Sequence, residues 1–250
     1  TQKRFKSRGY TMSDYEIGGD GRRTYYGVAI GILMVRTYFT RYLGDIGNAS
    51  TWEFPVSYKI VDDAIPSKMT DLHNASLLEP FKVAAKELVA EGVSGITTTC
   101  GFLSIYQNEL ADHCGVPVAS SSLLQVPFAQ TIIGTKKRVG VMTYNGSALQ
   151  GPYLEAVNVP QDTPVKGMPI NSEFVRWIND GDVSISFDTL REEVLVAARE
   201  FQAEHLDLGA IVLECTNLAP FSAHIATELG LPVFDCVTLV NWLHAGLRTK

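Results

Sequence analysis

A repeat of one segment constrains the fold of this chain more than any other sequence feature. Residues 95–121 read GITTTCGFLSIYQNELADHCGVPVASS, and residues 210–236 read AIVLECTNLAPFSAHIATELGLPVFDC. Three identical residues recur without a gap at an offset of 115 (215 − 100, 230 − 115, 232 − 117): Cys100 and Cys215, Gly115 and Gly230, Pro117 and Pro232. Each copy predicts a buried strand, a cysteine, a helix, a glycine that ends the helix, and a second strand. The chain is therefore predicted to contain two similar lobes that arose by duplication.

The sequence around the repeat alternates between strand and helix patterns. Residues 27–35, GVAIGILMV, form a continuous apolar run that is typical of a strand buried in a parallel sheet. Further strands are expected at 92–99, 116–120, 137–144, 208–214 and 231–237, and helices at 76–91, 102–113, 187–205, 217–229 and 239–248. This alternation predicts an α/β fold with two similar lobes, each a parallel sheet flanked by helices, related by a pseudo-two-fold axis.

The domain organisation follows from the same pattern. We assign residues 1–26 to an N-terminal arm, 27–135 to lobe 1 and 136–238 to lobe 2, with the C-terminal helix 239–250 as a candidate for completing lobe 1. The net charge of −6 argues against nucleic acid or an anionic membrane as a partner. No apolar run reaches about 18 residues, and residues 1–9 lack the apolar part of a secretory signal, so a cytoplasmic location is expected. A homo-oligomer is compatible with the sequence.

The repeat places Cys100 and Cys215 where a parallel strand ends and a helix begins. The carboxyl ends of strands form the ligand-binding edge of such sheets, so the two cysteines are expected to face one cleft. Backbone N–H dipoles at a helix N-terminus are expected to stabilise a thiolate and lower its pKa. Two acid–base groups on opposite faces of one carbon satisfy the geometry of racemisation without a cofactor. Cys114 and Cys236 have no partner at the repeat offset and are interpreted as core residues.

At these residues the sequence resembles the aspartate/glutamate racemase superfamily, which includes hydantoin racemases, arylmalonate decarboxylase and maleate isomerase. The resemblance spans about residues 28–248 and is strongest at residues 98–102 (TTCGF) and 214–217 (ECTN). It implies a cofactor-independent enzyme that uses two cysteines. Glutamate racemases follow the first catalytic cysteine with Asn-Thr, where this chain has Gly101 and Phe102. They follow the second with Thr-His, where this chain has Thr216 and Asn217. The loop at residues 44–48 (GDIGN) resembles a separate branch of the family.

Several other residues are expected to bind a small anionic or carboxylate-bearing substrate. Backbone N–H groups at the predicted helix starts favour a carboxylate or an enolate-like oxygen. Arg36 follows the first strand and is suited to a bidentate contact with a carboxylate, although a solvated surface arginine is an equal alternative. Asp45 and Asn48 lie in a Gly-bearing loop and also have an ordinary role as turn formers. The predicted substrate-binding residues are Thr99, Gly101, Phe102, Thr143, Tyr144, Thr216, Asn217, Asn48 and Arg36.

No nucleotide-binding glycine motif and no zinc spacing is present in the sequence, so neither a cofactor nor a metal is expected. The favoured function is a racemase or epimerase that inverts a carbon acid, such as an amino acid, a hydantoin or a related small carboxylate. One cysteine, as thiolate, removes the α-proton and the other, as thiol, returns a proton. The first alternative keeps the fold and changes the reaction to decarboxylation or cis–trans isomerisation; arylmalonate decarboxylase-like enzymes need only the second-lobe cysteine. The second alternative is a two-lobed binding protein without turnover.

Overall fold

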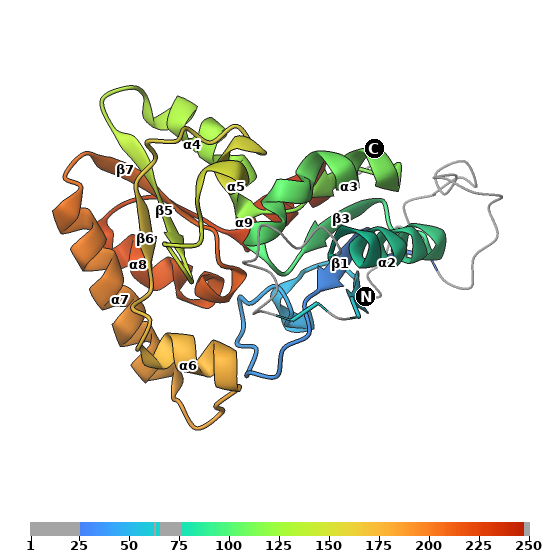
Figure 1. Cartoon of the computed structure of the whole chain (residues 1–250), viewed down its shortest axis with the longest axis horizontal. Helices are drawn as coiled ribbons and strands as arrows, with labels where there is room; N and C mark the ends of the chain where they lie inside the picture. Colours follow the sequence, from blue (N-terminus) through green and yellow to red (C-terminus); the bar gives the residue numbers. More distant parts are fainter. Residues whose placement is uncertain (1–25, 63, 66–76, 248–250) are drawn as a thin grey trace, which may run out of the picture.

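The computed structural model describes residues 26–62, 64–65 and 77–247. Two four-stranded sheets form the centre of the two lobes, and every strand pairing in them is parallel. The first sheet has the order β2 (Val56–Ile60), β1 (Ile30–Met34), β3 (Gly95–Thr98), β4 (Val118–Ala119). The second has the equivalent order β6 (Val165–Gly167), β5 (Arg138–Thr143), β7 (Leu208–Leu213), β8 (Val233–Phe234). The predicted α/β fold with two similar lobes is therefore confirmed (Figure 1).

The repeat is visible element by element. Cys100 caps the 3₁₀ helix η4 (Gly101–Tyr106), which continues as α3 (Gln107–Cys114). Cys215 caps η6 (Thr216–Phe221), which continues as α8 (Ser222–Leu229). Gly115 and Gly230 end these helices with φ values of 73° and 64°, a left-handed conformation that favours glycine. The predicted helices are therefore correct in position, but each begins with the tighter 3₁₀ winding that is frequent at helix ends.

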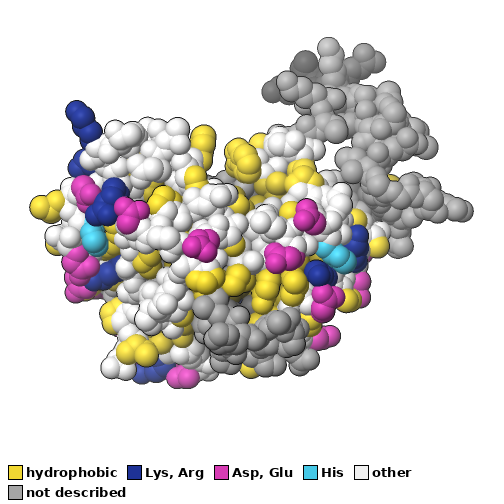
Figure 2. Space-filling view, turned by 45° about the horizontal axis from the view of Figure 1, so that its top comes forward, with side chains coloured by type: hydrophobic (Ala, Val, Ile, Leu, Met, Phe, Trp, Pro, Cys, Tyr) yellow, Lys and Arg dark blue, Asp and Glu magenta, His cyan; other side chains and the backbone are white. Residues whose placement is uncertain are grey.

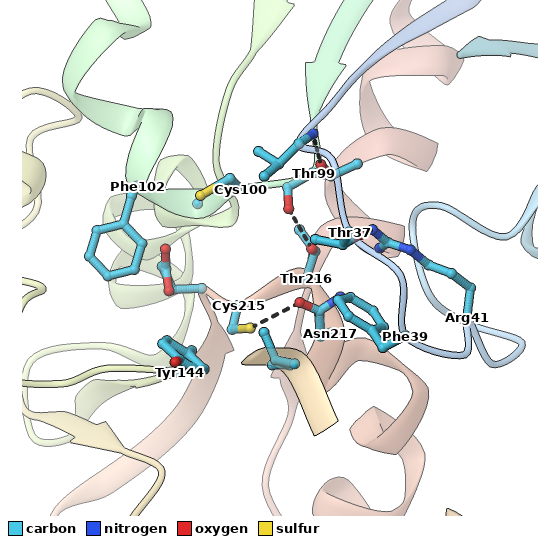
Figure 3. Close-up of a pocket in the computed structure, with 14 residues that line it drawn as sticks. Thr37, Phe39, Arg41, Thr99, Cys100, Phe102, Tyr144, Cys215, Thr216 and Asn217 are labelled. Atoms are coloured by element: carbon cyan, nitrogen blue, oxygen red, sulfur yellow. Dashed lines mark hydrogen bonds between the residues drawn. The ribbon is translucent and has the colours of Figure 1, made fainter. Parts of the chain in front are cut away.

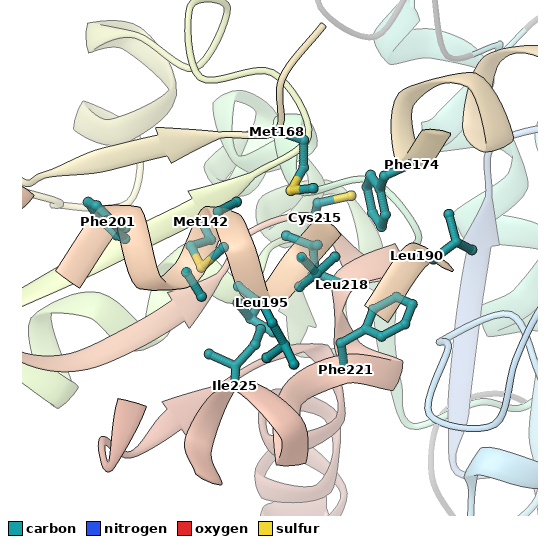
Figure 4. Close-up of a cluster of buried hydrophobic side chains, with 14 of the residues drawn as sticks. Met142, Met168, Phe174, Leu190, Leu195, Phe201, Cys215, Leu218, Phe221 and Ile225 are labelled. Atoms are coloured by element: carbon teal, nitrogen blue, oxygen red, sulfur yellow. The ribbon is translucent and has the colours of Figure 1, made fainter. Parts of the chain in front are cut away.

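Helices cover both faces of each sheet. On the first sheet, α2 (Leu78–Glu91) and α3 pack on one face, and α9 (Cys236–Leu247) packs on the other. On the second sheet, α6 (Glu173–Asp180), α7 (Phe187–Glu204) and α8 lie on one side. Figure 4 shows this core, in which Met142 lies among Leu195, Leu218 and Ile225. The opposite face is covered by α4 (Val126–Ile133) and α5 (Gly151–Glu155).

The two lobes exchange helices across their boundary. Helix α4 precedes the second sheet in the chain and packs against β5 and β7 of that sheet, whereas α9 follows it and contacts β3 and β4 of the first. Figure 1 shows α9 where the lobes meet. The lobe limits at 27–135 and 136–238 remain a prediction, and the arm predicted at 1–26 lies outside the described residues except for Tyr26.

Several elements are absent from our sequence prediction, namely β2, β6, α4, α5, α6 and the 3₁₀ helices η2 (Ala49–Thr51) and η5 (Ser122–Gln125). The strands β2 and β6 lie at sheet edges and are only partly buried, so they lack the apolar run of a central strand. Across residues 26–62, 64–65 and 77–247, no helix is long and apolar enough to cross a membrane. Acidic and basic side chains are interspersed on the face that Figure 2 displays, rather than gathered by sign.

Candidate active site

A pocket lies where the carboxyl ends of the central strands of both sheets meet, and both repeated cysteines line it (Figure 3). Cys100 follows β3 and is partly exposed, whereas Cys215 follows β7 and is buried. The pocket brings together eight of the predicted site residues: Thr99, Cys100, Gly101, Phe102, Tyr144, Cys215, Thr216 and Asn217. The repeat thus directs the equivalent strand ends of both lobes to one site.

Three predicted site residues are placed outside the pocket lining. Arg36 is half-exposed and pairs with Asp62 at 3.2 Å on the surface. The side chain of Asn48 accepts from the N–H of Ser50 and donates to the carbonyl of Arg41, so it stabilises its own loop. Thr143 is fully buried and its hydroxyl donates to the carboxyl group of Glu214.

A hydrogen bond between the lobes fixes the threonines that flank the cysteines. The hydroxyl of Thr216 donates to the carbonyl oxygen of Thr99 at 2.9 Å. The hydroxyl of Thr99 accepts from the N–H of Val35, also at 2.9 Å, and therefore is turned toward β1 (Figure 3). These contacts lock the first turns of η4 and η6 to each other, and with them the positions of both sulfur atoms.

A chain of polar contacts reaches Cys215 from the loop after β1. The thiol of Cys215 donates to Oδ1 of Asn217 at 3.7 Å, and Nδ2 of Asn217 donates to Oδ2 of Asp45 at 2.9 Å. Asp45 is fully buried, and its other oxygen accepts from Arg41 and from the N–H of Gly47, both at 2.7 Å. Arg41 also lines the pocket and replaces Arg36 as the cation at this edge. No sequence motif marks Arg41, because only the loop conformation turns it inward.

Both thiols are held in their neutral form. Burial and the negative charge of Glu214 raise the pKa of Cys100 to about 12, although the amides of Phe102 and Leu103 act in the opposite direction. The same two causes raise the pKa of Cys215 well above its usual value, against the amide of Asn217. Our expectation that helix N-termini would lower these pKa values is therefore wrong, because the loss of hydration and a nearby carboxylate outweigh the few amides that contact each sulfur.

Glu214 is a pocket residue that our sequence prediction did not select. Its side chain is 1% exposed, and burial raises the pKa of its carboxyl group to about 7. A Cβ atom on Gly101 would lie 2.2 Å from Oε1 of Glu214, so only a glycine after Cys100 leaves room for this carboxyl group. A glutamate at the end of an otherwise apolar strand, directly before Cys215, was the available signal. In the described part of the chain, no cluster of His, Cys, Asp and Glu side chains is suited to hold a metal ion.

The fold of the two lobes is similar to that of arylmalonate decarboxylase and of aspartate and glutamate racemases, as the sequence predicted. Unliganded arylmalonate decarboxylase aligns with a TM-score of 0.61 at 14% identity, covering 88% of this chain and 92% of the other. Glutamate racemase from Thermus thermophilus aligns with a TM-score of 0.55 at 21% identity, covering 90% and 84%. Aspartate racemase from Picrophilus torridus aligns with a TM-score of 0.54 at 17% identity, covering 90% and 96%. No protein-family model matches the chain.

Curated relatives carry a different activity. A dimethylsulfoniopropionate lyase from Durusdinium sp. clade D is 28% identical over 236 residues, which cover 87% of this chain and 74% of the relative. Dimethylsulfoniopropionate lyase 7 from Emiliania huxleyi (strain CCMP1516) is 27% identical, covering 88% and 67%. Lyase 6 from the same strain is also 27% identical, covering 88% of this chain and 60% of the relative.

These relatives correct our functional prediction. They are lyases, so the predicted racemase or epimerase, and with it the isomerase class, is wrong. The two-thiol pattern did not discriminate, because a thiol that removes a proton next to a carboxylate serves either an inversion or an elimination. The fate of the resulting carbanion decides the reaction class, and it depends on whether the neighbouring carbon bears a leaving group. Among our alternatives, the change of reaction on the same fold is the better supported.

Proposed function

We propose that this protein is a lyase that cleaves dimethylsulfoniopropionate by β-elimination, releasing dimethyl sulfide and acrylate. The observation that carries the proposal is the similarity to dimethylsulfoniopropionate lyases over 87% and 88% of the chain. A pocket lined by two thiols and a buried carboxyl group supports it, because an elimination needs a base next to a bound carboxylate.

The reaction needs one base and no redox partner. The base removes a proton from the carbon next to the substrate carboxylate, and the electrons of that C–H bond form the double bond of acrylate. The electron pair of the neighbouring C–S bond leaves with sulfur, which converts the sulfonium into neutral dimethyl sulfide. The proton on the base then passes to solvent, so the zwitterionic substrate yields acrylate, dimethyl sulfide and one proton.

We assign the base to Cys100. The amides of Phe102 and Leu103 act to lower the pKa of its thiol, which favours the thiolate. For Cys215, only the amide of Asn217 acts to lower the pKa. Its thiol donates a hydrogen bond to Oδ1 of Asn217, which favours the neutral thiol. Cys100 is also the more exposed of the two, so its proton has a path to solvent. Cys215 then forms the opposite wall of the site as a thiol.

The pocket offers polar groups for the substrate carboxylate. Arg41 lines it and donates to the hydroxyl of Thr37 at 2.6 Å. That hydroxyl already accepts a bond, so its own proton is available to a carboxylate oxygen. The predicted amide contacts at Gly101, Phe102, Thr216 and Asn217 remain part of the proposal.

Direct assay of the products tests this function. The protein is incubated with dimethylsulfoniopropionate, the headspace is analysed for dimethyl sulfide by gas chromatography, and acrylate is followed by proton NMR. We expect equal amounts of both products, and their loss in the Cys100→Ala variant. Intact, folded protein that forms neither product would contradict the proposal. The same samples in D₂O show whether unreacted substrate gains deuterium next to its carboxylate.

A further inference from the structure

The carboxyl group of Glu214 has an oxygen without a partner in a buried position of the pocket. Oε2 accepts from the hydroxyl of Thr143, whereas Oε1 is buried and has no hydrogen-bond partner among the described residues. Oε1 lies over Gly101, and Glu214 contributes to the pocket lining. Buried polar oxygens are nearly always paired in native structures, so an orphaned one in a residue that lines a pocket indicates a missing ligand group.

The missing group is a positive charge. Glu214 takes part in none of the ion pairs of the described residues, and only the Thr143 hydroxyl counteracts the effect of burial on its carboxyl pKa. Arg41, the cation that lines the same pocket, is already held by Asp45 and Thr37 at 2.7 and 2.6 Å. A buried carboxylate without a cation is strongly disfavoured, so the site is incomplete until a positive group enters.

The remaining walls suit a cation that carries methyl groups rather than N–H groups. The aromatic rings of Phe102 and Tyr144 line the pocket, as does Phe39, whose ring already carries the guanidinium of Arg41 at 4.5 Å. The hydroxyl of Tyr144 is held by Asn179 at 2.7 Å, which fixes its ring. Aromatic faces attract alkylated cations such as quaternary ammonium groups, and they do so without hydrogen bonds. A carboxyl group surrounded by aromatic rings is the usual composition of such a site.

We infer that Glu214 is the countercharge for an onium group, that is, a sulfonium or quaternary ammonium, and that it makes the pocket prefer such a ligand over a neutral ligand of the same shape. The inference rests on the proposed function only for the choice of ligand. Glu214 is thereby a specificity-determining residue and not the base of the elimination. Its negative charge raises the pKa of Cys100, and the onium charge offsets that effect when the substrate is bound.

Binding of the cation should also release a proton. Burial raises the pKa of Glu214 to about 7, so much of it is protonated in slightly acidic solution, and a bound cation favours the ionised form. The charged and titratable groups around it are the thiols of Cys100 and Cys215, with Tyr144, Asp45 and Arg41 nearby. The pKa values of both thiols and of Tyr144 are raised, so these groups stay protonated there. Asp45 and Arg41 already form an ion pair with each other. A proton lost on binding therefore comes from Glu214.

Two ligands of equal shape test the inference. β-Alanine betaine has a trimethylammonium group in place of the dimethylsulfonium and resists elimination. In its tert-butyl analogue, 4,4-dimethylpentanoate, the trimethylammonium group is replaced by an uncharged group of the same shape while the carboxylate is kept; it is called the neutral analogue for that group. Isothermal titration calorimetry measures the affinity of both ligands for the wild type and for Glu214→Gln. Glu109→Gln, the same exchange at an exposed position of α3, is the matched control. We expect Glu214→Gln to weaken the betaine at least about tenfold and to leave the neutral analogue unchanged. Unchanged affinity for the neutral analogue also shows that the variant is folded.

The wild type alone supplies a second readout. Titrations near pH 6, in buffers of different ionisation enthalpy, should report a release of about one proton per betaine and none for the neutral analogue. Equal losses for both ligands in Glu214→Gln, or no proton release in the wild type, would overturn the inference. A protein that cleaves dimethylsulfoniopropionate without this charge selectivity keeps its proposed function and loses the inference. A protein that selects the betaine through Glu214 but does not cleave dimethylsulfoniopropionate keeps the inference and loses the proposed function.

Discussion

Asp45 accepts a 2.9 Å hydrogen bond from Asn217, a residue 172 positions further along the chain. This contact joins the loop after β1 to the first turn of η6, and it orients the side chain that accepts a hydrogen bond from the thiol of Cys215. Its partner on the other side is Arg41. The lobes are thus connected at the site by the hydrogen bond between Asp45 and Asn217, and the partner of Asp45 within its own loop, Arg41, reaches the pocket lining.

Asp45→Asn should destabilise the protein and lower its activity. The exchange leaves Arg41 without its carboxylate in a mostly buried position, and breaking such a pair costs about 3 kcal/mol. It also leaves one acceptor oxygen where Asp45 has two, so the new side chain cannot accept from both Arg41 and Asn217. Urea unfolding and the rate of dimethyl sulfide release measure the two effects. Asp62→Asn is the matched control, because its pair with Arg36 is exposed and is worth at most about 1 kcal/mol. Equal stability of the two variants would contradict the role of Asp45.

Gly101→Ala should reduce both stability and product formation. The added Cβ would lie 2.2 Å from Oε1 and 2.5 Å from the carbonyl oxygen of Glu214, and the backbone atom has little freedom to move. Overpacking of this kind costs about 1–3 kcal/mol. Gly246→Ala in α9 meets no atom within 4 Å and is expected to stabilise the helix slightly. Thermal unfolding of both variants checks the contrast. An active and fully stable Gly101→Ala variant would show that stability and activity do not depend on the place of the Glu214 carboxyl group next to residue 101.

The two cysteine variants should differ. Cys100→Ser is expected to lower elimination by several powers of ten, because a serine hydroxyl does not supply a base near neutral pH. Cys215→Ser keeps a neutral donor beside Asn217, and we expect a loss of only about tenfold to a hundredfold. Cys114→Ser, at a core position of α3 outside the pocket, serves as the control. Steady-state kinetics with dimethylsulfoniopropionate measures all three. A larger loss in Cys215→Ser than in Cys100→Ser would exchange the roles of the thiols.

The rate should rise with pH through the neutral and alkaline range. The pKa of Cys100 is raised to about 12. Below that value, each rise of one pH unit therefore increases the thiolate fraction of Cys100 about tenfold. Glu214 must also ionise to hold the cation, with a pKa of about 7. The logarithm of kcat/KM against pH should therefore have a slope near two below about pH 7 and near one above it. Glu214→Gln should keep only the shallower slope. A bell-shaped profile centred near neutral pH would argue against a neutral resting thiol.

Phe102→Leu should weaken binding of the cationic substrate. Leucine keeps an apolar side chain at a position that is 5% exposed but removes the aromatic face, which is worth about 0.5–2 kcal/mol to a cation. We expect KM for dimethylsulfoniopropionate to rise by about threefold to thirtyfold, and the affinity for the neutral tert-butyl analogue to stay the same. Phe128→Leu, at an exposed site on α4, is the control. Equal weakening of both ligands would assign to Phe102 a packing role alone.

The sequence by itself determined the fold and the place of the site. Apolar runs, helical spacing and helix-ending glycines are local signals, and the offset of 115 positions repeated them in both lobes. Because parallel strands carry their binding edge at the carboxyl end, this order was enough to bring Cys100 and Cys215 to one pocket. It was not enough to find β2 and β6, whose edge positions remove the apolar pattern.

Only the tertiary structure decided the charges of the site. The pKa of each thiol depends on how completely the other lobe excludes water and on the distance to Glu214. Neither quantity can be predicted from the residues next to the cysteine in the sequence. The same holds for the cations: Arg36 and Arg41 are both near the end of β1, and the course of the loop turns one to the surface and the other into the pocket. Local sequence sets where a strand ends, whereas burial and the contacts across the two lobes set what the side chains there can do.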